Sequence, residues 1–336
     1  MTDAMNVTVL MDAGAIPDDD GDFTAHVQTT TEGHVVTALR ELGHTVRILG
    51  VGYDVPEIIA ALSDPRPDLV FNLAEQFGND RRLDVGVVSL LEMMGLRYTG
   101  TGQAGLMLCR DKGLCKQLLS LHRIRVPDFA VFPPDRPPRT RKRLRYPLIV
   151  KPVFEDGSDG IAIASVVSSD AELLQRVRFV HERFQQVAIA EEYIAGRELY
   201  VSVLGNARLR VFPAREIRFG DADAGGPPIA TSRVKWDKDY RDKWQIAYGF
   251  ADLDAATFAA VARVCKRAYR VLQLQDYGRI DLRLTPDNKI TLLEANPNPD
   301  IAYGDEVAEA ARVGGVDYNQ LIDTICRLAL RRGPKP

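Results

Sequence analysis

Residues 290–300, ITLLEANPNPD, begin as an apolar strand and end in polar residues followed by two prolines. Proline has no amide hydrogen for a β-ladder, so the strand must end at or near Asn296. Glu294 and Asn296 are two residues apart and therefore point to the same face of the strand. A carboxylate and an amide that share a face at a strand end suggest a site completed by residues from elsewhere in the chain.

The segment YGRIDLRL precedes this strand across the turn TPDN, and together the two predict a hairpin over residues 277–296. If the connecting loop holds an even number of residues, the hairpin presents its polar side chains on one face: Arg279, Asp281, Glu294 and Asn296. The other face then takes the apolar residues Ile280, Leu282 and Leu293. An odd loop would place Asp281 and Glu294 on opposite faces.

The polar face of this hairpin has the composition of a magnesium site. Asp, Glu and Asn side chains are hard oxygen donors, which suit Mg²⁺ held by carboxylates together with substrate phosphates. Arg279 beside them could stabilise a phosphate or a developing oxyanion. Taken alone, the hairpin is equally compatible with an exposed face that carries cross-strand ion pairs.

A second candidate site follows the strand LIVKPV, which is succeeded by the turn EDGSDG. Lys151 lies at the end of this strand, and Gly157, Ser158 and Gly160 lie in the turn. Backbone N–H groups and a hydroxyl in such a turn can hold phosphates, with the lysine as the point charge. The alternative is an exposed strand end.

Two further segments carry candidate nucleotide contacts. VAIAEEYIAGRE places Glu191 and Glu192 at a strand end and Glu198 after a glycine, where a carboxylate can accept both ribose hydroxyls; a solvated turn is the alternative. Residues 219–245 are polar and carry Lys235. A loop of this length is typical of a lid that closes on phosphates, or of a surface loop without a site.

The first hundred residues alternate between strand and helix patterns, which predicts a parallel sheet with helices on both faces. GTGQAG, at residues 100–105, matches the dinucleotide fingerprint G-x-G-x-x-G. It lies late in this region, however, and no acidic residue occurs about 20 positions beyond it. A nicotinamide site is therefore not expected.

The chain has 336 residues, of which 46% are apolar and 26% charged, with a net charge of −3. This length predicts two or three domains. The charge predicts neither a nucleic-acid partner nor an acidic membrane surface, and no apolar stretch approaches the roughly 18 residues of a membrane helix. The four scattered cysteines predict no disulfide or zinc framework and favour a reduced, cytoplasmic location.

Taken in order, these segments resemble the ATP-grasp superfamily, and most of all D-alanine–D-alanine ligases and related carboxylate–amine ligases. The similarity covers nearly the whole chain, and its strongest segments are LLEMMGLRYTGTG, DKGLCKQLL, YPLIVKPVFEDGSDGI, EEYIAGRELYVSVLGN, GRIDLRL and LLEANPNP. The resemblance implies an α/β protein with α+β lobes that hold ATP between them. The implied domains are a Rossmann-like pre-ATP-grasp domain at 1–105, a central ATP-binding subdomain at 106–195, and a C-terminal subdomain at 196–336 with the lid loop and the metal site.

The resemblance also implies roles for individual residues. Those implied to contact ATP are Lys112, Lys151, Glu155, Ser158, Glu191, Tyr193, Ile194, Glu198 and Lys235. Those implied to bind Mg²⁺, or Mn²⁺ in its place, are Asp281, Glu294 and Asn296. The implied catalytic residues are Arg279, Lys235 and Lys151, with Arg279 stabilising an acyl phosphate.

The implied reaction joins a small-molecule carboxylate to an amine, with amino acids as the expected substrates and a homodimer expected by analogy. An ATP-grasp phosphotransferase and a non-catalytic ATP-binding protein remain alternatives. The sequence departs from D-alanine ligases at the substrate positions. His26 stands where those enzymes carry an acid, although Asp22 or Glu32 could serve after a shift, and Asp300 replaces the glycine of a Pro-Gly-Met turn. The expected substrate residues are therefore His26, Asp300 and Arg279, and the expected pair is not two D-alanines.

Overall fold

The computed structural model describes residues 3–16, 29–138, 144–158, 160–220, 229–231, 233–234 and 237–332. In these parts of the chain the strands form three sheets, each built from its own stretch of sequence. The mixed helix and strand content confirms the predicted α/β class. The predicted domain limits themselves stay a prediction.

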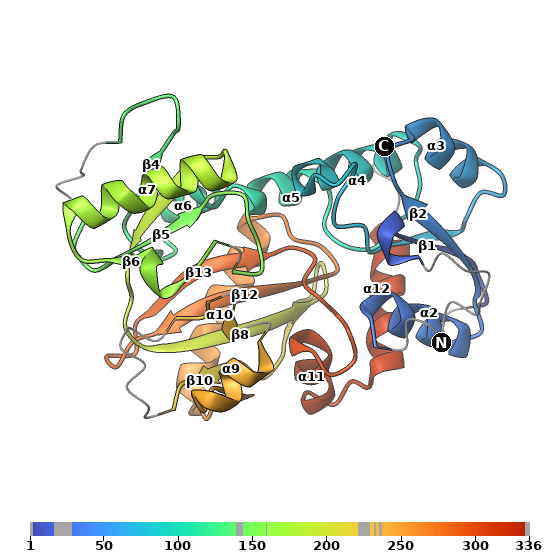
Figure 1. The fold of residues 1–336 in the computed structure, drawn as a ribbon. Coiled ribbons are helices and arrows are strands. Elements are labelled where there is room, and N and C mark those ends of the chain that lie inside the picture. The colour runs from blue at the N-terminus through green and yellow to red at the C-terminus, as the bar shows by residue number, and fades with distance from the viewer. Residues whose placement is uncertain are drawn as a thin grey trace.

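The first sheet is parallel and has the strand order β2-β1-β3. Its strands are β1 (Asn6–Asp12), β2 (Thr45–Val51) and β3 (Leu69–Asn72). One face packs against α2 (Thr31–Glu41), and the other against α3 (Val55–Ser63) and α4 (Asp84–Met93). This confirms the predicted parallel sheet with helices on both faces (Figure 1).

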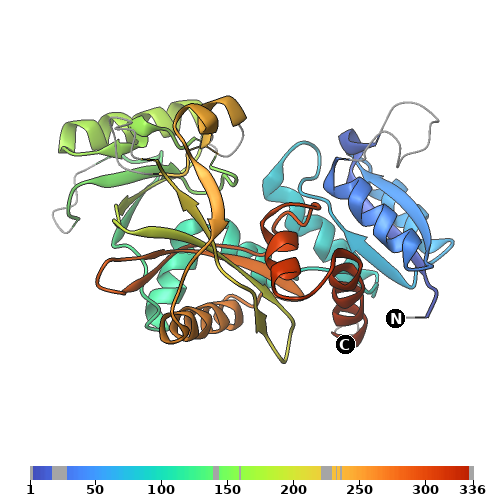
Figure 2. The ribbon, with the colours of Figure 1, turned by 90° about the horizontal axis from the view of Figure 1, so that it is seen from below.

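The last helix of the described chain returns to this first sheet. Leu321, Ile322 and Ile325 of α12 (Tyr318–Arg332) share a buried core with Val9 and Phe71. Figure 2 shows α12 and the preceding α11 (Glu306–Val313) between the C-terminal sheet and the N-terminal elements. The two ends of the chain are thus joined in one core.

The second sheet is antiparallel and has the order β4-β7-β5-β6. Its strands are β4 (Phe129–Phe132), β5 (Leu148–Pro152), β6 (Val166–Val167) and β7 (Ala188–Glu192). It packs against α7 (Asp170–Phe184), and it follows α5 (Gln103–Arg110) and α6 (Lys112–Leu121) in the chain. After the turn, residues 163–165 form a 3₁₀ helix, and only Val166–Val167 pair with β5.

The third sheet is antiparallel and has the order β11-β10-β8-β12-β13, with β9 also paired to β8. Its strands are β8 (Arg197–Leu204), β9 (Arg210–Val211), β10 (Arg215–Arg218), β11 (Ala247–Phe250), β12 (Tyr277–Leu284) and β13 (Ile290–Asn296). One face is covered by α10 (Ala255–Val271). A short helix, α9 (Lys238–Lys243), lies between β10 and β11 in a segment where the sequence showed no periodicity.

The register of the β12–β13 hairpin decides which side chains share a face. Leu284 pairs with Ile290, so the connecting loop holds residues 285–289, an odd number. A β-bulge then shifts the register by one residue, because Leu282 pairs with Leu292 while Asp281 pairs with Glu294. The polar residues therefore share a face as predicted, although the loop is odd.

The extra residue of the bulge is Leu293. It was expected on the apolar face, and this expectation is wrong, since Leu292 and Ala295 pack in the core while Leu293 is only partly buried beside Glu294. A bulge cannot be read from strand alternation because alternation assumes one residue per pair position.

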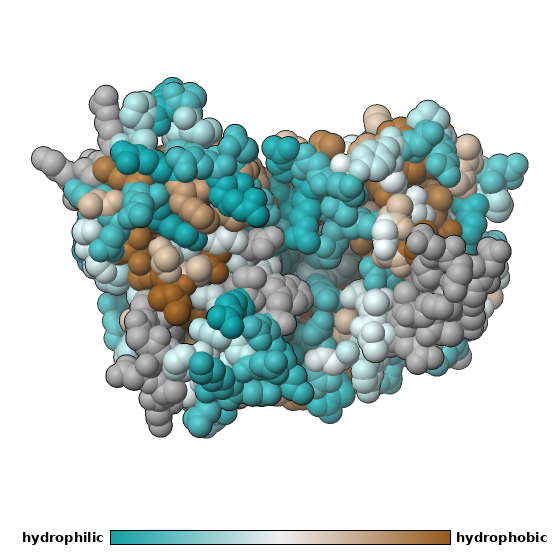
Figure 3. All heavy atoms as spheres, in the orientation of Figure 1, coloured by the Kyte–Doolittle hydropathy of each residue, from teal (hydrophilic) through white to brown (hydrophobic). Residues whose placement is uncertain are grey.

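Within the described residues, no helix is both long enough and apolar enough to cross a membrane. In the view of Figure 3 the molecule is hollowed between its two halves, and the visible walls of this hollow are mostly hydrophilic.

Candidate ATP and magnesium site

A cavity between the second and third sheets gathers most of the predicted nucleotide residues. Its lining includes Lys151, Ser158, Glu191, Tyr193, Ile194, Glu198, Asp281 and Glu294. These residues come from five strands, the turn after β5 and the segment that follows β7, and they are far apart in the sequence. The structure thus brings the predicted phosphate, adenine, ribose and metal groups to one place.

We call the face of the third sheet that carries Arg279, Asp281 and Arg283 the site face. Arg279 lies directly opposite Asn296, and Asp281 directly opposite Glu294. The Arg279 guanidinium donates to both oxygens of Asp281, at 2.8 and 3.0 Å, and Asn296 Nδ2 donates to Asp281 Oδ2 at 3.1 Å.

Arg279 also donates to Glu306, at the start of α11. Burial opposes the charge of Arg279, but attraction to Asp281 and Glu306 outweighs it and holds the pKa of Arg279 well above its ordinary value. Arg279 is therefore a permanent cation beside the metal-type ligands.

Two buried lysines of α6 form ion pairs with carboxylates that line this cavity. Lys112 Nζ lies 2.8 Å from Glu294 Oε1 and also donates to the carbonyl of Glu155. Burial lowers the pKa of Lys112, yet Glu294 and Asp156 raise it above its ordinary value. Lys112 therefore stays charged.

Sequence reasoning missed Lys116, one helical turn after Lys112. Its ammonium lies 3.1 Å from Glu191 Oε1, and Lys151 donates to Glu191 Oε2 at 3.0 Å. The two lysines overcome the burial of Glu191 and lower its pKa. The i, i+4 spacing in DKGLCK was the available signal, because it places both lysines on one helix face.

Arg283 was missed as well. It lies opposite Glu198 on the neighbouring strand and donates to Glu198 Oε2, while the Tyr200 hydroxyl donates to Glu198 Oε1 at 2.9 Å. The alternation in RIDLRL carried the signal, since it puts Arg283 on the same face as Asp281. Glu198, the predicted ribose ligand, is thus oriented by two partners.

The turn after β5 is held in place from outside the cavity. Arg110 donates to Asp156 in the turn and to Asp84 at the start of α4. Gly160 has a φ of +73°, and a Cβ there would lie 2.7 Å from Pro152 and 2.9 Å from Phe184, so only glycine fits.

The Glu155 side chain does not line this cavity. Its Oε1 accepts from Gln186 Nε2 at 2.7 Å, and Gln186 Oε1 accepts from the amide of Phe154. The structure therefore places the carboxylate of Glu155 against β7 and leaves its carbonyl facing Lys112.

Asp300 lies apart from the nucleotide cavity. Its Oδ1 accepts from Thr31 Oγ1 at 2.5 Å and from the amide of Ala302 at 2.8 Å. Burial and the neighbouring Asp300 carboxylate raise the pKa of Asp305 to about 7. His26, Asp22 and Lys235 lie outside the described residues.

Further carboxylates lie towards the N-terminal sheet. Burial raises the pKa values of Asp12, at the end of β1, and Glu75, just after β3; Glu32 adds to both shifts, and Asp300 adds to that of Glu75. The carboxyl ends of parallel strands are the usual edge for ligands in α/β sheets. Asp300 thus lies within electrostatic reach of two other carboxyl groups, Glu75 and Asp305.

The residues present fit a magnesium ion. No three His, Cys, Asp or Glu side chains group as a metal site in the described part of the chain. Two carboxylates and an amide oxygen, from Asp281, Glu294 and Asn296, are nevertheless a donor set that Mg²⁺ takes when phosphate oxygens complete its shell.

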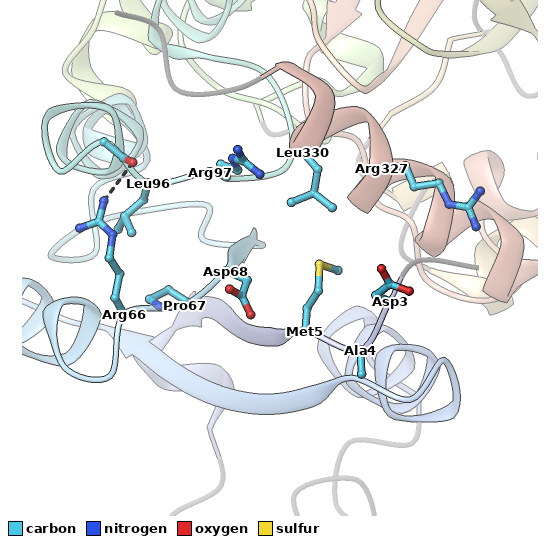
Figure 4. A pocket seen from close by; sticks show the side chains of 11 residues that line it. Asp3, Ala4, Met5, Arg66, Pro67, Asp68, Leu96, Arg97, Arg327 and Leu330 are labelled. Atoms are coloured by element: carbon cyan, nitrogen blue, oxygen red, sulfur yellow. Dashed lines mark hydrogen bonds between the residues drawn. The ribbon is translucent and has the colours of Figure 1, made fainter.

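A larger hollow of about 720 Å³ lies elsewhere, between the N-terminal sheet and α12 (Figure 4). It contains none of the predicted site residues. Arg66 at its edge donates to the carbonyls of Met94 and Gly95, which end α4. The volume of a cavity alone therefore does not identify the candidate nucleotide site.

Comparison with known proteins agrees with the geometry. The family model described as D-ala D-ala ligase C-terminus matches residues 119–327. The D-alanine–D-alanine ligase of Bordetella petrii is 35% identical over 270 residues, covering 80% of this chain and 77% of its own. An uncharacterised protein of Sinorhizobium fredii is 31% identical over 304 residues, covering 89% of this chain and 87% of its own.

A solved structure shows the same fold. The D-alanine–D-alanine ligase of Bacillus anthracis complexed with ATP superposes with a TM-score of 0.76 at 20% identity, covering 98% of both chains. The match of the family model over most of the chain decides the family. The chain therefore belongs to the D-alanine–D-alanine ligase family of ATP-grasp proteins.

Proposed function

We propose that this protein is an ATP-dependent carboxylate–amine ligase that forms an amide bond through an acyl phosphate and releases ADP and phosphate. The observation that carries the proposal is the shared face of Arg279, Asp281, Glu294 and Asn296 beside a cavity that the buried Lys151 lines, with Lys112 paired to Glu294 at its wall. This arrangement supplies metal ligands, phosphate cations and an oxyanion-stabilising arginine, and a non-catalytic ATP-binding protein has no need of the complete set.

In the first step, the carboxylate oxygen of one substrate bonds to the terminal phosphorus of ATP while the bond to ADP breaks. Lys112 and Lys151 neutralise charge on the transferred phosphoryl group, and Ser158 and the turn amides orient it. Asp281, Glu294 and Asn296 would hold magnesium, which supplies further charge neutralisation when bound.

In the second step, the amine of the other substrate attacks the acyl carbon. The carbon–oxygen bond to phosphate breaks, phosphate leaves with the electron pair, and the nitrogen gives up a proton. Arg279 stabilises the oxyanion of the tetrahedral intermediate, because its charge is fixed and its position is held by Asp281 and Glu306. No protein nucleophile is required.

The nucleotide is proposed to lie with adenine at Tyr193 and Ile194 and ribose at Glu198. Lys235 is proposed to contact the phosphates, with residues 219–245 as the lid. Protease cleavage within 219–245 should slow when Mg-ATP is added, and unchanged cleavage would remove the lid assignment. The homodimer and the cytoplasmic location remain expectations.

We also propose that the substrates are not two D-alanines. Asp300 replaces the glycine of a turn whose backbone N–H groups are expected to hold the second substrate's carboxylate, and it adds charge beside Asp305. Such a carboxylate pair repels an acid and attracts an amine. Because several relatives are named D-alanine–D-alanine ligases, D-alanine is the substrate with which others are compared.

The test measures ADP and phosphate release with Mg-ATP across pools of D- and L-amino acids, diamines and hydroxy acids, D-alanine included, with mass spectrometry of each pool. ADP release that requires one acid and one amine, with a condensed product, supports the ligase. A phosphorylated product without condensation would make the protein a phosphotransferase. ATP binding without turnover in any pool would contradict the proposal.

A further inference from the structure

Arg215 extends the row of polar side chains on the site face by two strands. On β10 it lies directly opposite Tyr200 of β8, and Tyr200 lies directly opposite Asp281 of β12, which in turn faces Glu294. Directly opposed residues of a ladder point to the same face of the sheet. Arg215 is therefore on the site face, on the side of Tyr200 away from the metal-type ligands.

Contacts in the structure confirm the direction of this side chain. The guanidinium carbon of Arg215 lies 5.8 Å from the ring centre of Tyr248 and 6.0 Å from that of Phe250. Tyr248 in turn lies 6.3 Å from Tyr200, ring centre to ring centre. Two aromatic rings thus hold the guanidinium without neutralising it.

The cations nearest to the nucleotide cavity each have a carboxylate partner, and Arg215 does not. The partnered cations are Arg279 with Asp281, Arg283 with Glu198, Lys112 with Glu294, and Lys151 and Lys116 with Glu191. Arg215 Nε is buried and has no hydrogen-bond partner among the described residues, and no carboxylate there forms an ion pair with the guanidinium. A buried donor left without a partner is unfavourable, so a bound anion would recover free energy here.

Carboxylates lie at longer range on the other side of this position. The charge of Arg215 acts on Asp305 and Glu309, at the start of α11. Asp300 lies close enough to Asp305 to raise the pKa of its carboxyl. A ligand between these groups would meet a cation at one end and a carboxylate pair at the other.

We infer that Arg215 binds the non-reacting carboxylate of the acceptor amine, so that the acceptor is an amino acid whose amine faces Asp300 and Asp305. This inference rests on the proposed ligase function. The reacting carboxylate belongs beside Arg279 and the metal-type ligands, so a carboxylate at Arg215 belongs to the second substrate. Arg215 thus determines specificity and takes no part in the bond-forming steps.

The experiment compares amino-acid acceptors with the same amino acids as carboxamides, in the wild-type protein and in Arg215→Gln. The wild type should prefer the acid by about 10- to 100-fold in kcat/KM, the usual value of a charged hydrogen bond, and Arg215→Gln should lose this preference through the KM of the acceptor. The KM for ATP should not change. Melting temperatures establish that both proteins are folded.

Arg218→Gln is the matched control. Arg218 lies on the same strand but faces the opposite side, where it contacts Glu216 Oε2 at 3.4 Å and the carbonyl of Phe250 at 2.9 Å. This variant should keep the preference for the acid. An Arg215→Gln enzyme that still condenses its substrates and prefers the acid as strongly as the wild type would overturn the inference and leave the ligase function standing.

A binding measurement covers the case in which the wild type makes no condensed product. In that case, the carboxylate site at Arg215 is tested by calorimetric titration alone. The amino-acid and carboxamide pools are titrated in the presence of Mg²⁺ and a non-hydrolysable ATP analogue. Binding of the acids to the wild type but not to Arg215→Gln would support the carboxylate site although the ligase function had failed. Equal binding to both proteins, or to neither, would overturn it.

Discussion

Arg279 and Asp281, two residues apart on β12, are joined by two hydrogen bonds. Arg279 Nε donates to Asp281 Oδ1, and Arg279 Nη2 donates to Asp281 Oδ2. Because strand neighbours at i and i+2 share a face, the spacing in the sequence places these two side chains next to each other. It fixes the arginine against the sheet and turns the carboxylate towards Asn296 and Glu294. The geometry at the centre of the site is thus set within one strand.

Glu294→Gln should reduce ADP formation by at least about a hundredfold, because an amide cannot replace a carboxylate in holding magnesium beside the phosphates. The measurement is the rate of ADP release at saturating Mg-ATP and substrates. Glu309→Gln, which alters a pair with Arg312 on α11, is the control and should leave the rate unchanged. A Glu294→Gln enzyme with wild-type activity would eliminate Glu294 as a metal ligand.

Lys116→Met should lower the free energy of unfolding by about 3 kcal/mol, since it removes one of two cations from the buried carboxylate of Glu191. The lysine is only 1% exposed. Urea unfolding measures the difference. Lys289→Met, which alters an exposed pair with Asp287, should change stability by less than about 1 kcal/mol. Equal effects of the two variants would contradict the structural role of Lys116.

Arg110→Gln should raise the KM for ATP by about 10- to 100-fold, because the turn that holds the phosphates loses its link to α4 through Asp84 and Asp156. Steady-state kinetics with varied ATP provides the test. Arg82→Gln, which alters an exposed pair with Asp80, is the control and should keep the wild-type KM. A normal KM in Arg110→Gln would show that the turn is positioned without this bridge.

Asp305→Asn should stabilise the protein at alkaline pH and have little effect near pH 4. Burial and Asp300 raise the pKa of Asp305 from 3.8 to about 7, so the folded state resists ionisation of this group. Its contribution to stability is therefore lost as pH rises from about 4 to about 7. Because the side chain is partly exposed, solvent screening limits the gain at pH 8 to about 1 kcal/mol.

Thermal unfolding of both proteins between pH 4 and pH 8 measures this effect. The melting temperatures should coincide at pH 4 and separate steadily up to pH 7, with the variant higher. A constant difference across the whole range would show that Asp305 is not ionised in this window.

Much of the candidate site could be predicted because its chemistry follows regular spacing. The alternation of RIDLRL put Arg279 and Asp281 on one face of their strand, that of LLEAN did the same for Glu294 and Asn296, and the order of the segments indicated the ATP-grasp fold. Groups whose role depends on a tertiary partner were not predictable in this way. Nothing in the sequence around Lys116 or Arg110 shows that Glu191 or Asp156 lies within reach.

The positions of Arg215 and Leu293 could not be predicted from the sequence, for different reasons. Arg215 begins the short strand β10 in a segment rich in arginine, and only the pairing of β10 with β8 reveals which face it takes. Leu293 breaks the alternation on which strand prediction depends. The break in alternation at Leu293 brings Glu294 onto the same face as Asp281 and so completes the site.

In a simple hairpin, the length of the turn fixes the register of the second strand. The bulge at Leu293 removes this dependence. Lys116 binds the carbonyl of Leu293, and the amide of Leu292 donates to the carbonyl of Arg125 at 2.9 Å, so the phase of β13 is anchored to the body of the protein. The exposed turn at 285–289 therefore does not determine which way Glu294 points. It offers a permissive position where a reporter peptide or an affinity tag can be grafted into the middle of the chain, within the same hairpin as the metal-type ligands, while their orientation is kept.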